Sequence, residues 1–141
     1  MREILLVRFG EVFLKGQNRP FFMKKLMDHI RQAVRPVNGR VWMSEGRFYV
    51  SDFTDMDECI RRVTRVFGVH SVSPAIEMDK DNFEAICEQA ARMMEPLSGT
   101  FKVLARRSDK RYPLDSPAIM REAGGYILDH VPQLTVDVNH P

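Results

Sequence analysis

The chain has 141 residues, 44% of them hydrophobic and 28% charged, which is ordinary for a globular protein of one or two domains. No apolar run approaches the roughly 18 residues that a membrane-spanning helix needs, and the first residues lack a signal-peptide pattern, so we expect a cytoplasmic protein that does not bind membranes. Cys59 and Cys87 lie far apart, without a CxxC spacing or a nearby histidine pair. This spacing predicts neither a disulfide nor a metal site.

The first half of the chain predicts six elements in the order strand, helix, strand, strand, helix, strand. They are a strand at 3–8, a helix that starts at Asn18 or Arg19 and ends near Pro36, strands at 40–43 and 47–51, a helix from Thr54, and an extended segment at 69–78. Both helices carry apolar residues at intervals of three or four positions. This order is typical of the split βαβ, ferredoxin-like arrangement, with two helices on one face of an antiparallel sheet.

Several details of these elements follow from residue type. Trp42, Phe48 and Val50 are expected to point inward from the two short strands. The hydroxyl of Thr54 is expected to cap the second helix, and Phe67 is expected to belong to the apolar face of that helix.

The second half predicts a helix, a strand, a basic loop, another helix and a last strand. Asp81 is the expected cap of the first helix, and the apolar run Phe101–Ala105 is the expected buried strand. Asp115 opens the helix that follows the loop. The final strand is expected at 134–138.

The loop between the Phe101 strand and the second helix concentrates positive charge. Residues 76–141 are acidic overall, with 8 Lys and Arg against 11 Asp and Glu, yet five of those cations lie between Lys102 and Arg111. A helix start presents unpaired N–H groups and a partial positive charge, so loop and helix together predict a surface that binds anions such as phosphates. An ordinary solvated surface is the alternative.

Gly124 and Gly125 lie inside the helix that follows this loop. Adjacent glycines in a helix interior cost roughly 1 kcal/mol each relative to alanine. We therefore expect that something approaches the helix closely here. It is either another element of the protein or the backbone of a ligand.

Two motifs resemble parts of known families. One motif resembles the core of a THUMP domain, an RNA-binding module of tRNA-modifying enzymes. It consists of Arg106–Pro113, Ser116–Pro117, Arg121–Glu122 and Gly124–Gly125–Tyr126. The stretch Arg8–Arg19 resembles the N-terminal signature of the tRNA 4-thiouridine synthetases, also called thiamine biosynthesis sulfurtransferases. The two motifs occur in the order that this family uses.

This resemblance implies an α+β chain with a ferredoxin-like domain at 1–76 and a THUMP domain at 77–141 that is incomplete at its C-terminus. It also implies a set of RNA-binding residues in both domains. Those in the second are Arg106, Arg107, Lys110, Arg111, Tyr112, Ser116, Arg121, Gly124 and Gly125; those in the first are Arg8, Lys15, Asn18 and Arg19. The cations are expected to contact phosphates and Tyr112 to stack on an exposed base. For the first-domain cations, salt bridges to Glu11 or Asp28 are the alternative.

The resemblance further implies that the full-length protein converts uridine at position eight of tRNA to 4-thiouridine and has a role in thiamine biosynthesis. ATP with Mg²⁺ would act in a catalytic domain that is absent here, and a cysteine desulfurase would donate the sulfur. The partner of this region would be the acceptor end of tRNA. Whether the protein forms a homodimer is left open. No serine-glycine-glycine phosphate loop and no catalytic constellation is visible in the sequence. This chain alone is expected to carry no cofactor and to be inactive.

Two alternatives remain open at this point. The THUMP-like segment could belong to another tRNA-modifying enzyme, either a methyltransferase or a pseudouridine synthase. The chain could also be a ferredoxin-like ligand-binding module that never meets RNA, since that fold carries many functions.

Overall fold

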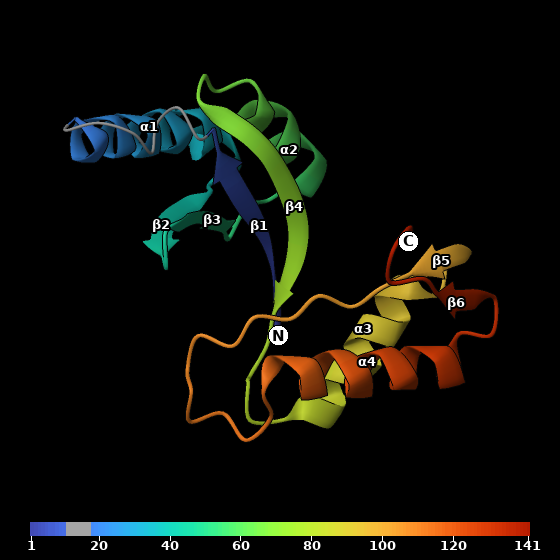
Figure 1. Cartoon of the computed structure of the whole chain (residues 1–141). Helices are drawn as coiled ribbons and strands as arrows, with labels where there is room; N and C mark the ends of the chain where they lie inside the picture. Colours follow the sequence, from blue (N-terminus) through green and yellow to red (C-terminus); the bar gives the residue numbers. More distant parts are fainter. Residues whose placement is uncertain (11–17) are drawn as a thin grey trace. The chain divides into compact units, whose positions relative to one another are not determined.

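The computed structural model describes residues 1–10 and 18–141, and these form two compact units, Met1–Met78 and Asp79–Pro141. The elements of the first unit follow the predicted order (Figure 1). They are β1 (Arg2–Phe9), α1 (Arg19–Val34), a 3-10 turn η2 (Arg35–Val37), β2 (Arg40–Ser44), β3 (Arg47–Ser51), α2 (Met56–Thr64) and β4 (Val69–Glu77).

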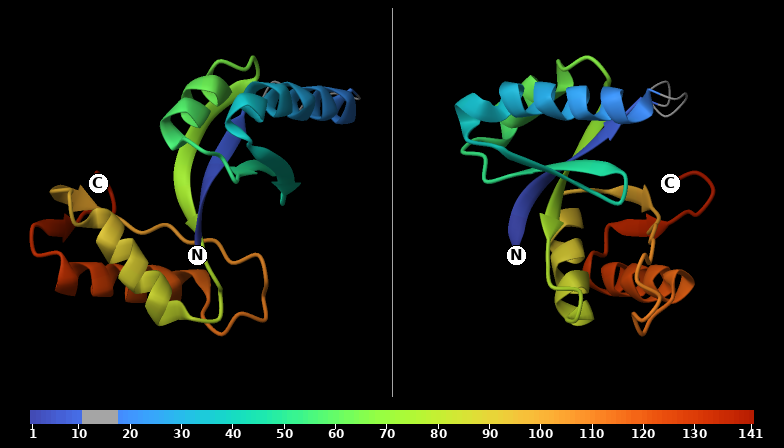
Figure 2. Two further views of the ribbon diagram at one scale, coloured as in Figure 1. Left: turned by 180° about the vertical axis from the view of Figure 1, so that it is seen from behind. Right: turned by 90° about the vertical axis from the view of Figure 1, so that its left-hand side faces the viewer.

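The first unit is a four-stranded antiparallel sheet in the order β2-β3-β1-β4, with α1 and α2 on one face (Figures 1 and 2). β1 is central, because it pairs with both β3 and β4. Strand order and element order together confirm the predicted ferredoxin-like arrangement.

The core of the first unit lies between the sheet and its two helices. Leu5 and Val7 of β1 and Phe48 and Val50 of β3 have no exposed surface, and α1 and α2 bury their apolar faces against them. The prediction that Trp42 points inward is wrong. Its neighbour Val41 fills the core position instead, and because side chains alternate along a strand, Trp42 lies on the face away from the helices.

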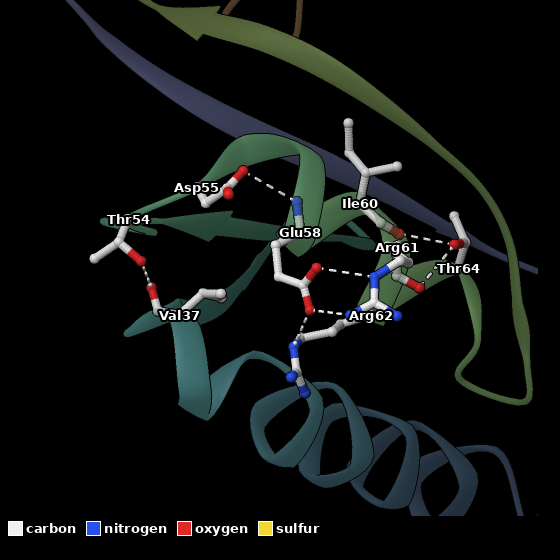
Figure 3. A network of polar contacts seen from close by, with 8 residues as sticks. All are labelled: Val37, Thr54, Asp55, Glu58, Ile60, Arg61, Arg62 and Thr64. Atoms are coloured by element: carbon white, nitrogen blue, oxygen red, sulfur yellow. Dashed lines mark hydrogen bonds and ion pairs between the residues drawn. The ribbon is translucent and has the colours of Figure 1, made fainter.

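The start of α2 is held by side chains (Figure 3). The predicted Thr54 cap is wrong: Asp55 accepts the Glu58 N–H at 3.1 Å, while the hydroxyl and the N–H of Thr54 donate to the Val37 carbonyl. Thr54 therefore ties the start of α2 to the end of η2. Phe67 is 87% exposed, because α2 ends at Thr64, so its predicted place on the apolar helix face is also wrong.

The second unit has two helices and a small parallel sheet. The elements are α3 (Phe83–Met94), β5 (Gly99–Phe101), α4 (Ser116–His130) and β6 (Leu134–Val136). α3 packs against α4, and β5 pairs with β6 at one end of the helix pair (Figure 1). The core is formed by Ala91, Phe101, Ile127, Val131 and Leu134.

Two predicted details of the second unit are wrong. α3 is capped by Asn82, whose amide oxygen accepts the Ala85 N–H at 3.1 Å, while Asp81 uses its own N–H in a turn with Asp79. The strand expected at 101–105 ends at Phe101, and Leu104 is 78% exposed. From there to α4 the chain has no regular secondary structure, as the long segment in Figure 2 shows. Over residues 1–10 and 18–141, no helix is long and apolar enough to cross a membrane.

Candidate nucleic-acid interface

The basic loop, residues 106–112, is braced by one of its own arginines. The N–H of Arg107 donates to the Ser116 hydroxyl at 3.2 Å, and its guanidinium donates to the Tyr112 carbonyl at 3.1 Å. Arg107 is half-buried, so its charge faces the loop more than the solvent. Arg107 and Ser116, both predicted to contact RNA, hold the shape of the loop in this structure.

Asp109 joins the basic loop to the segment before α3. Its carboxylate accepts the N–H and the guanidinium of Arg111 at 3.0 and 3.1 Å, and it forms an ion pair with Lys80 at 3.0 Å. The hydrogen bond from the Arg111 side chain is the main reason that the pKa of Asp109 lies well below its usual range, and Lys80 adds to the effect. Lys80 was not predicted, because it stands alone in the sequence between Asp79 and Asp81.

Three cations of the basic loop are exposed to solvent. Arg106 and Lys110 are exposed, and neither forms an ion pair with any residue that the structure describes. Arg111 keeps 91% of its side chain exposed although it contacts Asp109. These three side chains can approach phosphate oxygens without first breaking a buried contact.

A cavity of about 240 Å³ lies between the basic loop and α3. Arg106, Arg107, Asp109, Tyr112 and Lys80 supply polar or aromatic side chains to its wall. The rest of the lining is Phe83, Ile86, Ser108 and Ile119. Positive charge at the edge of a largely apolar hollow is an arrangement that suits a phosphate with its adjoining base.

The start of α4 is less open to anions than predicted. The Asp115 carboxylate accepts the Ala118 N–H at 2.9 Å, the Asp115 carbonyl accepts the Ile119 N–H at 2.9 Å, and Pro117 has no N–H to offer. The carboxylate also places a negative charge at the helix start. The loop side chains are therefore better placed than the helix N-terminus to meet a phosphate.

Gly124 and Gly125 are not required by any close contact among the described residues. A Cβ on Gly124 would meet Val103 at 3.7 Å, an ordinary contact distance, and a Cβ on Gly125 would meet nothing within 4 Å. Both line a groove of about 630 Å³ together with the exposed Arg121. The predicted close approach by another element is absent from the described part of the chain, and approach by a ligand stays a prediction.

The four predicted residues of the first unit have different positions. Arg8, on β1, donates to the Ser73 hydroxyl at 2.7 Å and forms no ion pair with Asp28, while its other expected partner, Glu11, lies outside the described residues. Asn18 precedes α1 and accepts the Phe22 N–H through its carbonyl, with no cap from its side chain. Arg19 is exposed at the first position of α1, and Lys15 lies outside the described residues.

Nothing in the described residues resembles a catalytic centre. No group of three or more His, Cys, Asp or Glu residues there could hold a metal ion. Burial raises the pKa of the Cys59 thiol to about 11 and also raises that of Cys87, so neither thiol is a ready nucleophile. Asp55, Asn82 and Asp115 cap three of the helices, and the side chain of each accepts one backbone N–H.

Comparison with known families and structures decides the assignment. A model of the ThiI ferredoxin-like domain matches residues 4–73, and a model of the THUMP domain matches residues 80–141. The chain belongs to the family that joins these two domains. The curated relatives include probable tRNA sulfurtransferases from Acetivibrio thermocellus and Alkaliphilus metalliredigens, each 43% identical over all of this chain. The chain spans 38% of the length of each of these two relatives.

Two solved structures share the fold of this ThiI ferredoxin-like and THUMP pair. PH1313 from Pyrococcus horikoshii has a TM-score of 0.81 and 30% identity over 98% of this chain and 48% of its own. A 4-thiouridine synthetase in complex with RNA and with bound ATP has a TM-score of 0.81 and 28% identity over 100% of this chain and 36% of its own. That synthetase binds RNA, and the part of it that matches this chain is about a third of its length.

Proposed function

We propose that this chain is the tRNA-binding region of a tRNA sulfurtransferase that converts uridine at position eight to 4-thiouridine. The observation that carries the proposal is the position of the basic loop: its exposed cations, held in place by Asp109 and Arg107, lie within the segment that matches a THUMP domain.

In this proposal the chain recognises tRNA, and the chemical reaction takes place in other parts of the longer protein. Arg106, Lys110 and Arg111 contact phosphates of the tRNA acceptor end, and Tyr112 lies beside them for an exposed base. ATP with Mg²⁺ and the sulfur from a cysteine desulfurase act in parts of the longer protein that this chain does not include. The site of action is the cytoplasm, and a role in thiamine biosynthesis belongs to the same longer protein.

The test is a binding titration of the chain against a labelled folded tRNA and an unstructured RNA of the same length, at several salt concentrations. We expect tighter binding to the folded tRNA and a logarithm of affinity that falls linearly with the logarithm of salt concentration. The double variant Arg106→Glu, Lys110→Glu should bind about tenfold more weakly or worse. Arg107 is left unchanged, because its loss would disturb the loop itself.

The matched control is Arg92→Glu, which reverses an exposed arginine on α3 outside the basic loop. Its affinity should fall much less than that of the double variant. Equal affinity of wild type and double variant, in samples shown to be folded, would contradict the proposal. A ligand-binding module without an RNA partner would then be the better account.

A further inference from the structure

A second concentration of arginines lies in the first unit, in a pocket of about 640 Å³ where α1 ends and β2 begins. We call it the arginine pocket. It is lined by Arg31, Arg35, Asn38, Gly39, Arg40, Val41 and Trp42. None of these residues was predicted to contact RNA, and the basic loop belongs to the other unit.

A tight turn brings these arginines together. Asn38 adopts the left-handed conformation, with a φ of 61°, and the Gly39 N–H returns to the Val34 carbonyl at 3.0 Å. A Cβ on Gly39 would lie 2.7 Å from Cβ of Val34, so only glycine lets the chain turn back this closely. Arg31 and Arg35, four residues apart and thus on one side of the helical segment, consequently lie beside the first residues of β2.

The charges of the arginine pocket are poorly compensated. Arg31 lies 3.6 Å from Asp28, and both side chains are about half exposed. Arg35 and Arg40 form no ion pair with any residue in the described ranges. The arginines of α2 differ, because Glu58 binds both Arg61 and Arg62 (Figure 3).

Trp42 adds an aromatic wall to this positive pocket. Its ring stacks on Tyr49 of β3, with centroids 5.4 Å apart, and the guanidinium of Arg2 lies 5.2 Å from its centroid. Arg40 and Trp42 are two residues apart on one strand, so both project from the sheet face that the helices do not cover. Guanidinium groups bind phosphates through paired hydrogen bonds, and indole rings stack on bases.

We propose that the arginine pocket binds single-stranded RNA, with Arg35 and Arg40 on a phosphate and an adjoining unpaired base against Trp42. The proposal rests on the proposed function, since it takes RNA as the ligand, and it adds a second, separate RNA contact in the ferredoxin-like unit. Single-stranded RNA fits better than a duplex, because only an unpaired base offers its face to an aromatic side chain.

The chain supplies its own reporter, because Trp42 is the only tryptophan in the sequence. A short unstructured RNA is titrated into the chain, and Trp42 fluorescence is measured after correction for RNA absorption with free N-acetyltryptophanamide. In parallel, the anisotropy of the same RNA carrying a dye reports total binding. We expect the RNA to change Trp42 fluorescence over the same concentration range in which anisotropy rises.

Variants separate this site from the basic loop. Arg35→Ala, Arg40→Ala should weaken the fluorescence titration about tenfold, as the loss of two phosphate contacts predicts. Arg65→Ala, which removes an exposed arginine just after α2, is the matched control and should change it less than about twofold. Arg106→Glu, Lys110→Glu should lower total binding and leave the Trp42 response in place. Arg35→Gln alone serves if the double variant does not fold.

The outcomes distinguish this proposal from the proposed function. A Trp42 response that the pocket variants weaken, and the control does not, supports it. RNA binding by anisotropy with no Trp42 response, or with a response that the pocket variants leave unchanged, overturns the arginine pocket and leaves tRNA binding by the basic loop intact. Absence of RNA binding in both measurements overturns the arginine pocket only, because the proposed function is tested separately by the titration with folded tRNA.

Discussion

The two units bury their apolar side chains to very different extents. In the first, a four-stranded sheet and two helices enclose a continuous cluster whose central members, such as Leu5, Ile30 and Phe48, have no exposed surface. In the second, the described cluster is smaller and consists of Ala91, Phe101, Ile127, Val131 and Leu134. A two-layer unit with a closed core should therefore resist unfolding better than one with a two-stranded sheet.

The largest expected effect tests this difference directly. Phe48→Ala should lower the free energy of unfolding of the first unit by about 3–5 kcal/mol, because it leaves a cavity in a closed core. Phe101→Ala in the second unit should cost less, about 0.5–3 kcal/mol, because the smaller cluster can relax around the loss. Urea unfolding followed by Trp42 fluorescence reports the first unit, and hydrogen exchange of α4 amides reports the second. Equal losses would show that the two cores are equally well packed.

Gly39 in the first unit and Gly125 in the second allow a further comparison of how tightly the two units are packed. Gly39→Ala should destabilise the first unit by about 1–3 kcal/mol, because the new methyl group would overlap Val34. Gly125→Ala should stabilise the second unit by about 1 kcal/mol, because it improves helix propensity where the structure has open space. Thermal unfolding of both variants provides the measurement. If Gly125→Ala also weakens RNA binding, a ligand approaches this side of α4; a destabilising Gly125→Ala would contradict the open space.

Helix caps should show no such contrast between the units, because they act locally. Asp55→Ala at the start of α2 and Asp115→Ala at the start of α4 each remove one side-chain acceptor of a backbone N–H. Each substitution should cost about 1 kcal/mol of the stability of its own unit. Asp→Asn at either position is the conservative control and should retain most of it. A loss that differs severalfold between the two caps would show that one of them has a further role.

The smallest effect concerns pH. In each unit an arginine lowers the pKa of a carboxylate through a side-chain hydrogen bond: Arg61 acts on Glu58, and Arg111 acts on Asp109. A lowered pKa in the folded state means that the stabilisation is complete above the ordinary value and is lost only as pH falls through the folded value. The window therefore lies below the ordinary values of 4.5 for Glu58 and 3.8 for Asp109. NMR titration of both carboxyl carbons measures it; ordinary midpoints would rule out these contacts in solution.

The order of elements in the first unit was predictable, because the apolar residues repeat at distinct helix and strand intervals. The orientation of Trp42 was not, since an alternating strand gives two choices of face and the size of an indole favours the wrong one. Phe101–Ala105 was misassigned as a strand for a related reason: an apolar run indicates burial only when a partner element covers it. Among the described residues, β6 pairs with this run no further than Phe101.

The candidate site was partly predictable. The density of positive charge identified the basic loop, but it could not distinguish Arg107, which braces the loop, from Arg106, which faces solvent. Lys80 and the arginine pocket were missed because their members are distant in the sequence and meet only after folding. Contacts of this kind leave no local pattern, whereas the Asp115 cap, which depends on neighbouring residues, was correctly identified.

The pairing of β1 with β4 has a mechanical consequence. The two strands run antiparallel, side by side, along nearly their whole length (Figure 1). Arg2 at the start of β1 therefore lies opposite Glu77 at the end of β4, and the Arg2 guanidinium donates to the Glu77 carboxylate at 2.6 Å. The chain thus enters and leaves the first unit at one corner, as is common for domains that tolerate insertion. Tension between the chain start and Met78 would load this ladder one hydrogen bond at a time. Under such tension, β1 and β4 should separate sequentially from this end, although the closed core of the unit is expected to resist unfolding by denaturant.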